Sequence, residues 1–169
     1  MKKNQLLTGM LLLLGLAAPL WAQKAYTPAA GSAERKSMMD VLRIAVADYY
    51  SDFFTKENPP VFTVQHLKVA GDWAYAEVST QPVVVAADKE PLENMSSVDR
   101  NAGSDQKSAK WTVSAWALYH KEPYGWDMAF NSTNGGAKDY EMSLDEGRAE
   151  AYRDMRKRYP KAPASIFPK

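Results

Sequence analysis

The stretch VFTVQHLKVAGDWAYAEVST, residues 61–80, decides the fold of this chain. β-branched and aromatic residues are frequent in it, and hydrophobicity repeats with a period of two on both sides of Gly71-Asp72. That pattern is typical of antiparallel strands, and a Gly-Asp pair is typical of a tight turn. The stretch therefore predicts a hairpin of two strands, Val61–Val69 and Trp73–Val85, in which Trp73 faces a packed helix.

Two positions interrupt this hairpin. The apolar residues before and after Gln65-His66 share one face of the first strand only if a bulge there shifts the register by one residue. Pro82 has no amide hydrogen to donate, so we expect the second strand to bend or end there, at a sheet edge.

A helix is expected before the hairpin. Gly31-Ser32 can open it, and Glu34 places negative charge in its first turn. The pattern fades near Thr55, and Asn58-Pro59-Pro60 prevents continuation. We expect Met39 and Leu42 of this helix to pack against Trp73. Spacings of three and four predict one broad apolar face, made by Met38, Met39, Val41, Leu42, Ala45, Val46 and Tyr49.

The second half of the chain predicts a loop, two strands and a helix. Asp88–Ser108 is polar and without periodicity, and is expected to be a long mobile loop. Lys110–Lys121 and Trp126–Phe130 alternate and predict strands joined by a turn. Residues 143–159 begin with the capping-box spacing and predict a helix that ends at a proline. The tail after it is expected to dock on the body through Ile166-Phe167.

Together these elements predict a single α+β domain over residues 31–169, after a lead-in at residues 23–30. The expected architecture is a long N-terminal helix packed on a four-stranded antiparallel meander, followed by a C-terminal helix. A twisted sheet wrapped over the first helix would bury its broad apolar face.

Residues 1–22 have the layout of a secretory signal peptide. Lys2-Lys3 precede an apolar run from Leu6 to Ala18, and Ala22 supplies a small residue at the cleavage site. The apolar stretch is about 15 residues, shorter than the roughly 20 of a membrane-spanning helix. We therefore expect cleavage near Ala22 and a periplasmic or secreted mature protein that does not span the membrane.

Composition excludes several classes of function. About 147 of the 169 residues would remain after cleavage, enough for one domain with a substantial core. The chain has no cysteine, which excludes disulfides, a thiol nucleophile and a lipoprotein anchor. Removal of Lys2-Lys3 changes the formal net charge from +1 to −1. This near-neutral charge argues against electrostatic binding of nucleic acid.

The sequence contains no recognisable catalytic or metal motif. His66 and His120 each stand alone, without the paired spacing of a zinc site. A nucleophile elbow and a phosphate-binding glycine loop are missing. Asp99–Asp105 has oxygen-bearing residues at alternate positions, but Gly103 stands where a calcium loop has its third ligand. We therefore expect no catalytic residue, metal or cofactor, and histidines that are structural or at the surface.

Five short motifs carry a family resemblance, and the match in which they lie spans about half of the mature chain: GSxxRK (31–36), MxxLR (39–43), VFxV (61–64), LxVxGDWA (67–74) and YPxAPxxIF (159–167). The chain resembles a group of small, mostly uncharacterised secreted bacterial proteins with a cystatin-like helix-plus-sheet core. The resemblance implies that fold and no agreed activity. The wider cystatin-like architecture includes protease inhibitors and ketosteroid-isomerase-like enzymes, so the fold does not decide the function.

Aromatic residues on the predicted strands are candidates for binding. Trp111 and Trp116 are an odd number of positions apart and must point to opposite faces of a regular strand. One face would meet the helix, and the other would be covered by the C-terminal segment or open to a partner. An exposed aromatic face would bind a peptide, a glycan or an unknown envelope protein. The candidates are Trp111, Trp116, Tyr119 and Trp126.

An isomerase-like enzyme would instead hold a carboxylate and hydrogen-bond donors in a pocket between helix and sheet. The candidates for that pocket are Asp48, Tyr49, Tyr75 and His120.

A third feature is the excess of cations over Arg153–Lys161. These cations can complement the dipole at a helix C-terminus, or they can bind an acidic envelope polymer or an anionic lipid surface.

The sequence favours an exported, non-enzymatic binding or accessory module of the bacterial cell envelope. One alternative is a small-molecule-binding or isomerase-like enzyme, and another is an inhibitor of an envelope-degrading enzyme. A polar cavity around Asp48 or His120 would favour the enzyme. A dry core with an exposed aromatic face would favour the binding module.

Overall fold

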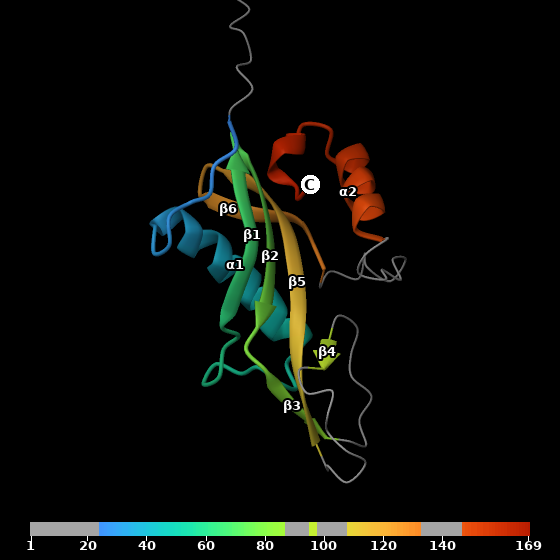
Figure 1. Cartoon of the computed structure of the whole chain (residues 1–169). Coiled ribbons are helices and arrows are strands. Elements are labelled where there is room, and N and C mark those ends of the chain that lie inside the picture. The colour runs from blue at the N-terminus through green and yellow to red at the C-terminus, as the bar shows by residue number, and fades with distance from the viewer. Residues whose placement is uncertain (1–23, 87–94, 98–107, 133–146) are drawn as a thin grey trace, which may run out of the picture.

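The computed structural model describes residues 24–86, 95–97, 108–132 and 147–169. It is an α+β chain with a curled antiparallel sheet and two α-helices (Figure 1). The predicted signal peptide and the predicted capping box at residues 143–146 lie outside the described residues. The elements are α1 (Ala33–Tyr49), β1 (Phe62–Ala70), β2 (Trp73–Thr80), β3 (Val83–Ala86), β4 (Met95–Ser97), β5 (Ser108–Glu122), β6 (Gly125–Asn131), α2 (Gly147–Arg158) and the 3-10 helix η2 (Ala164–Ile166).

The sheet is built around the long strand β5. β2 lies between β1 and β5, and all neighbouring strands are antiparallel. The first part of β5 pairs with β3 and β4, and its last part pairs with β6. β1, β2, β5 and β6 correspond to the predicted strands, but β3 and β4 also pair with β5, so the prediction of a four-stranded sheet is wrong.

The β1–β2 hairpin agrees with the prediction from residues 61–80. Gly71 in its turn has a φ of 62°, a left-handed conformation that glycine adopts without strain. The register shifts between Val64 and His66, so of the two arrangements that the sequence left open, the one with a bulge is present. β2 ends at Thr80, before Pro82, so the predicted break at the proline is present. The predicted strand Trp73–Val85 is nevertheless two strands, because residues 83–86 form β3, and β2 lies between β1 and β5 rather than at a sheet edge. Because of the bulge, one core receives the side chains of Phe62, Val64, Leu67 and Val69.

The end of α1 and the predicted long loop differ from the sequence prediction. α1 begins as expected, because the Arg35 backbone N–H donates to the Ser32 hydroxyl oxygen at 3.2 Å. It ends at Tyr49 rather than near Thr55, and the chain continues in a turn. The predicted loop Asp88–Ser108 contains β4, a strand too short to show an alternating pattern. The rest of that loop, residues 88–94 and 98–107, lies outside the described residues.

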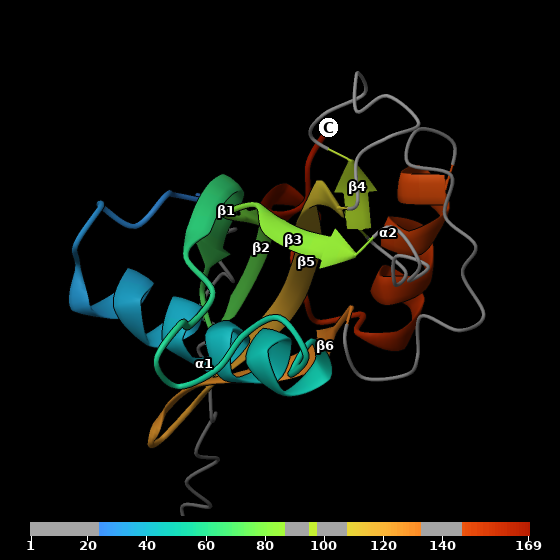
Figure 2. The ribbon, with the colours of Figure 1, turned by 90° about the horizontal axis from the view of Figure 1, so that it is seen from below.

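α1 and α2 lie on opposite sides of the curled sheet (Figures 1 and 2). α1 buries Met38, Met39, Leu42 and Val46 against one face of the sheet. None of the helices in the described ranges combines the length and hydropathy that a membrane span requires. The fold is thus one sheet with a separate apolar core on each side.

Trp73 lies on the face opposite to the predicted one. We expected it to pack against Met39 and Leu42 of α1, and this prediction is wrong. Trp73 and Tyr75 belong to the core under the C-terminal segment. The α1 side of β2 is formed by Ala74, Ala76 and Val78. β2 is apolar on both faces, so alternation shows which residues share a face but not which face meets α1.

The C-terminal segment covers the second face of the sheet. Met155 of α2 and Ile166 and Phe167 of the tail are buried there against Tyr75 and Leu118. The predicted docking of Ile166 and Phe167 is therefore confirmed. Their burial fixes the part of the chain that carries the candidate site.

Candidate functional site

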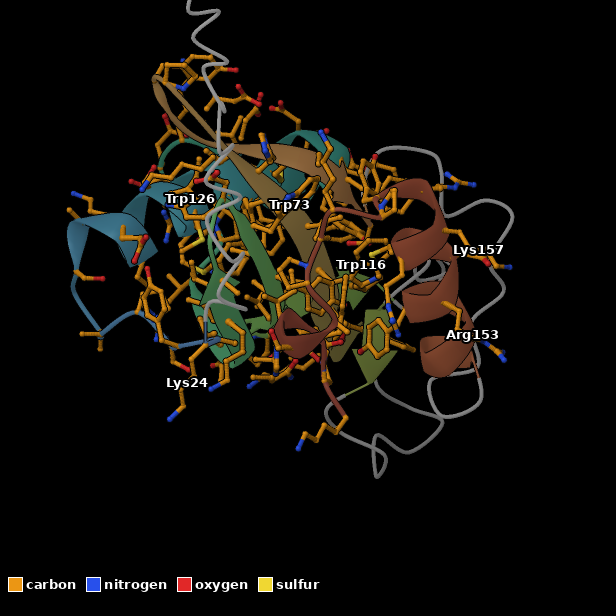
Figure 3. The ribbon with its side chains drawn as sticks, turned by 90° about the horizontal axis from the view of Figure 1, so that it is seen from above. Lys24, Trp73, Trp116, Trp126, Arg153 and Lys157 are labelled. Atoms are coloured by element: carbon orange, nitrogen blue, oxygen red, sulfur yellow. The ribbon has the colours of Figure 1, made fainter. Side chains whose placement is uncertain are left out.

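The four aromatic candidates are divided between the two cores. Trp111, Tyr119 and Trp126 belong to the core at α1, whereas Trp116 packs with Phe130 on the other face, with ring centroids 5.3 Å apart. Trp111 and Trp116 thus point to opposite faces, as predicted. Figure 3 shows Trp126 on the α1 side and Trp116 toward α2. These side chains form parts of two cores rather than one exposed aromatic face.

The four pocket candidates also lie apart. Asp48 and Tyr49 are exposed at the end of α1. Tyr75 is 1% exposed and belongs to the core on the opposite face of the sheet. His120 is half-exposed near the end of β5. The arrangement does not bring a carboxylate and donors together between α1 and the sheet.

A polar bridge between β2 and α2 helps to fix the C-terminal segment. The Tyr75 hydroxyl donates to a Glu77 carboxylate oxygen at 3.0 Å, and the Tyr152 hydroxyl of α2 donates to the same oxygen. Burial, assisted by the charge of Glu77, raises the pKa of Tyr75 well above its ordinary value. Tyr75 therefore keeps its proton and remains a donor at neutral pH.

Two further hydrogen bonds hold the chain that follows α2. The Tyr159 hydroxyl donates to the Ala129 carbonyl oxygen of β6 at 2.7 Å. His66 Nε2 lies 2.7 Å from the Ile166 carbonyl oxygen and donates to it in the tautomer that carries the proton there. His66 is thus a structural link between β1 and η2, in agreement with the sequence prediction.

The outer surface of this segment carries a hollow of about 520 Å³, which we call the basic hollow. Its cations are exposed, and among them Lys157 forms an ion pair with Asp154 at 3.2 Å. Figure 3 shows the side chains of Arg153 and Lys157 directed away from the body of the protein. The hollow is lined by Arg153, Arg156, Lys157, Pro160, Lys161, Ala162, Pro163 and Ala164.

A second hollow of about 360 Å³ shares Lys161 with the basic hollow. In it, His120 Nδ1 lies 2.7 Å from a Glu122 carboxylate oxygen. The rings of Trp73 and His120 are 4.6 Å apart between centroids. The side chains that line it are Trp73, His120, Glu122, Asp127, Met128, Ala129 and Lys161.

Sequence reasoning selected His120 but missed its neighbours. β2 and β5 pair in a register that sets Trp73 opposite His120, and the β5–β6 hairpin sets Asp127 opposite it on the other side. The hairpin pairing could have been found from the turn at Glu122–Gly125. The neighbour on β2 could not, because a long segment separates the two strands and leaves their register open.

Within the described residues, no cluster of three or more histidines, aspartates and glutamates has a geometry suited to a metal ion. The basic hollow can instead attract anions, since it holds exposed guanidinium and ammonium groups.

Comparisons with protein-family models, curated proteins and solved structures found no match to this chain.

Proposed function

We propose that this protein is an exported, non-enzymatic binding module of the bacterial cell envelope. The observation that carries the proposal is the basic hollow, which lies on the outer side of the C-terminal segment that covers the second core. Exposed cations on a fixed surface are suited to holding a partner, because little conformational freedom has to be lost on binding.

The spatial separation of the enzyme candidates favours binding over catalysis. General acid–base chemistry needs its groups within hydrogen-bond reach of one substrate. Asp48 and Tyr75 lie on opposite sides of the sheet. Met38, Leu42 and Val46, at the interface of α1 with the sheet, are completely buried, which supports a dry core there.

Export is proposed from residues 1–22, whose charged start, short apolar run and small residue at Ala22 form the layout of a signal peptide. The mature protein would then act in the periplasm or outside the cell. We also propose that α1 and the sheet form a cystatin-like core, a view supported by one helix packed on a curled antiparallel sheet.

The first test is the mass of the exported protein. A mass that lacks the first 22 residues supports export and cleavage near Ala22. A mature form that retains Leu6 to Ala18 would contradict the proposed localisation.

The second test is retention of native envelope material on the immobilised exported chain. We expect the wild type and an Asp48→Asn/His120→Gln variant to retain the same component, because neither side chain lines the basic hollow. An Arg156→Glu/Lys157→Glu variant should lose it. Retention that depends on Asp48 and His120, or a chemical change in the retained component, would favour the enzyme instead.

A further inference from the structure

We propose that the basic hollow binds a soluble acidic polymer that carries carboxylate or phosphate groups. This inference rests on the proposed binding function and names the chemistry of the ligand. The whole chain has a formal net charge of only +1. The cations that line the hollow are therefore a local concentration of charge, formed by Arg153, Arg156, Lys157 and Lys161.

The cations extend beyond what the end of a helix requires. Basic residues in the last turn offset the partial negative charge of a helix C-terminus, and α2 ends at Arg158. Arg158 itself does not line the hollow, because its guanidinium lies over the Phe130 ring, 5.6 Å from the ring centroid. Arg153 precedes the last turn and Lys161 follows the helix, yet both line the basic hollow. The helix dipole does not account for their convergence, whereas a ligand with several negative charges does.

The geometry of the hollow fits a chain of anionic groups. Residues four positions apart lie on the same side of a helix and are separated by about 6 Å along its axis, which applies to Arg153 and Lys157. Arginines offer planar donor pairs that match carboxylate and phosphate oxygens, and lysines add compact charges. A volume of about 520 Å³ is far more than one phosphate fills. A polymer segment with several acidic groups would occupy it.

The floor of the hollow is fixed before a ligand arrives. Pro160 and Pro163 restrict the backbone, and the Ala162 N–H donates to the Tyr159 carbonyl oxygen at 2.9 Å. Ala162 is itself 6% exposed and belongs to the core beneath. Binding therefore has to order the cationic side chains but not the segment that carries them.

The lining also distinguishes acidic polymers from other anionic partners. Apart from its cations, it consists of proline and alanine. Amphipathic segments that lie on membranes insert large apolar or aromatic side chains, and single-stranded nucleic acids stack their bases on aromatic rings. Because the lining of this hollow has neither, it favours an acidic polymer without bases or lipid chains.

The test measures binding of the exported protein to polyglutamate, polyphosphate, and vesicles of phosphatidylcholine with phosphatidylglycerol. An Arg153→Glu/Lys161→Glu variant reverses two cations of the hollow. The matched control, Lys24→Glu/Lys36→Glu, changes the net charge equally at exposed sites outside it. Figure 3 shows Lys24 on the opposite side of the molecule from α2.

At low salt we expect the wild type and the control to bind at least one soluble polymer with affinities within about threefold of each other. The hollow variant should bind about ten- to a hundredfold more weakly, since two attractions become repulsions. Added salt should reduce these differences by screening. The preferred polymer identifies the carboxylate or the phosphate as the recognised group.

Two outcomes would overturn the proposal. Equal losses in both variants would mean that binding follows net charge rather than the hollow. Binding to the anionic vesicles with no binding to either polymer would point to a membrane surface.

A competition experiment separates this inference from the proposed function. Displacement of the retained envelope material by excess polyglutamate or polyphosphate supports the inference. If the exported chain retains that material but neither polymer displaces it, the acidic polymer is wrong and the binding module stands. If the chain is not exported or retains nothing, the proposed function itself fails.

Discussion

Tyr75 and Tyr119 are both almost fully buried, but their hydroxyl groups have different surroundings. Tyr75 donates to Glu77, whereas the Tyr119 hydroxyl has no hydrogen-bond partner among the described residues. Burial of an unpaired hydroxyl costs about 1–3 kcal/mol. We therefore expect Tyr119→Phe to raise the free energy of unfolding by about 1 kcal/mol, and Tyr75→Phe to lower it by about 1 kcal/mol, in urea titrations. Destabilisation by Tyr119→Phe would contradict this.

The same two tyrosines predict a loss of stability at alkaline pH. Burial raises the pKa of Tyr119, and burial together with the Glu77 charge raises that of Tyr75. Above about pH 10 the unfolded chain releases protons that the folded chain retains, so stability falls as the pH rises. The limiting slope is about 1.4 kcal/mol per pH unit for each tyrosine.

This pH dependence can be tested with a Tyr75→Phe/Tyr119→Phe double variant. Urea titrations between about pH 9 and pH 11 should show a shallower loss of stability in the variant than in the wild type. The comparison of slopes removes the contribution of the other ionisable groups, which both proteins share. Identical slopes would show that neither hydroxyl has a raised pKa.

At the scale of elements, η2 and the residue after it hold the C-terminal segment on the sheet. Ile166 is completely buried, whereas its neighbour Ser165 is exposed. Ile166→Ala should lower the free energy of unfolding by about 2–5 kcal/mol, and Ser165→Ala should change it by less than about 0.5 kcal/mol. Denaturant titration measures both, and a small effect of Ile166→Ala would mean that the segment is only loosely docked.

The accuracy of the sequence predictions follows how local each feature is. The β1–β2 turn was predicted, and the position of a possible bulge near His66 was recognised, because a short stretch of sequence determines them. The face of Trp73 was not, because it depends on where distant segments pack on a strand that is apolar on both sides. The basic residues of α2 were visible in the sequence. That Lys161 joins them in one hollow depends on how the chain turns after the helix.

At the scale of the whole molecule, one sheet serves two cores. β2 and β5 contribute side chains to both, so neither core can lose its sheet without exposing the other. This sharing connects the C-terminal segment, and with it the basic hollow, to the stability of the entire fold. We therefore expect the two cores to unfold together in a two-state transition.

The tryptophans allow that expectation to be tested, because each core contains two of them. Trp111 and Trp126 belong to the core at α1, and Trp73 and Trp116 to the core under the C-terminal segment. In the chain without residues 1–22, and so without Trp21, the fluorescence of a Trp73→Phe/Trp116→Phe variant reports on the first core. The fluorescence of a Trp111→Phe/Trp126→Phe variant reports on the second. Within each variant, the urea midpoint from fluorescence should equal the midpoint from far-UV circular dichroism, since unfolding of a shared sheet removes both cores. A fluorescence midpoint for the second core well below that from dichroism would show that the C-terminal segment detaches first.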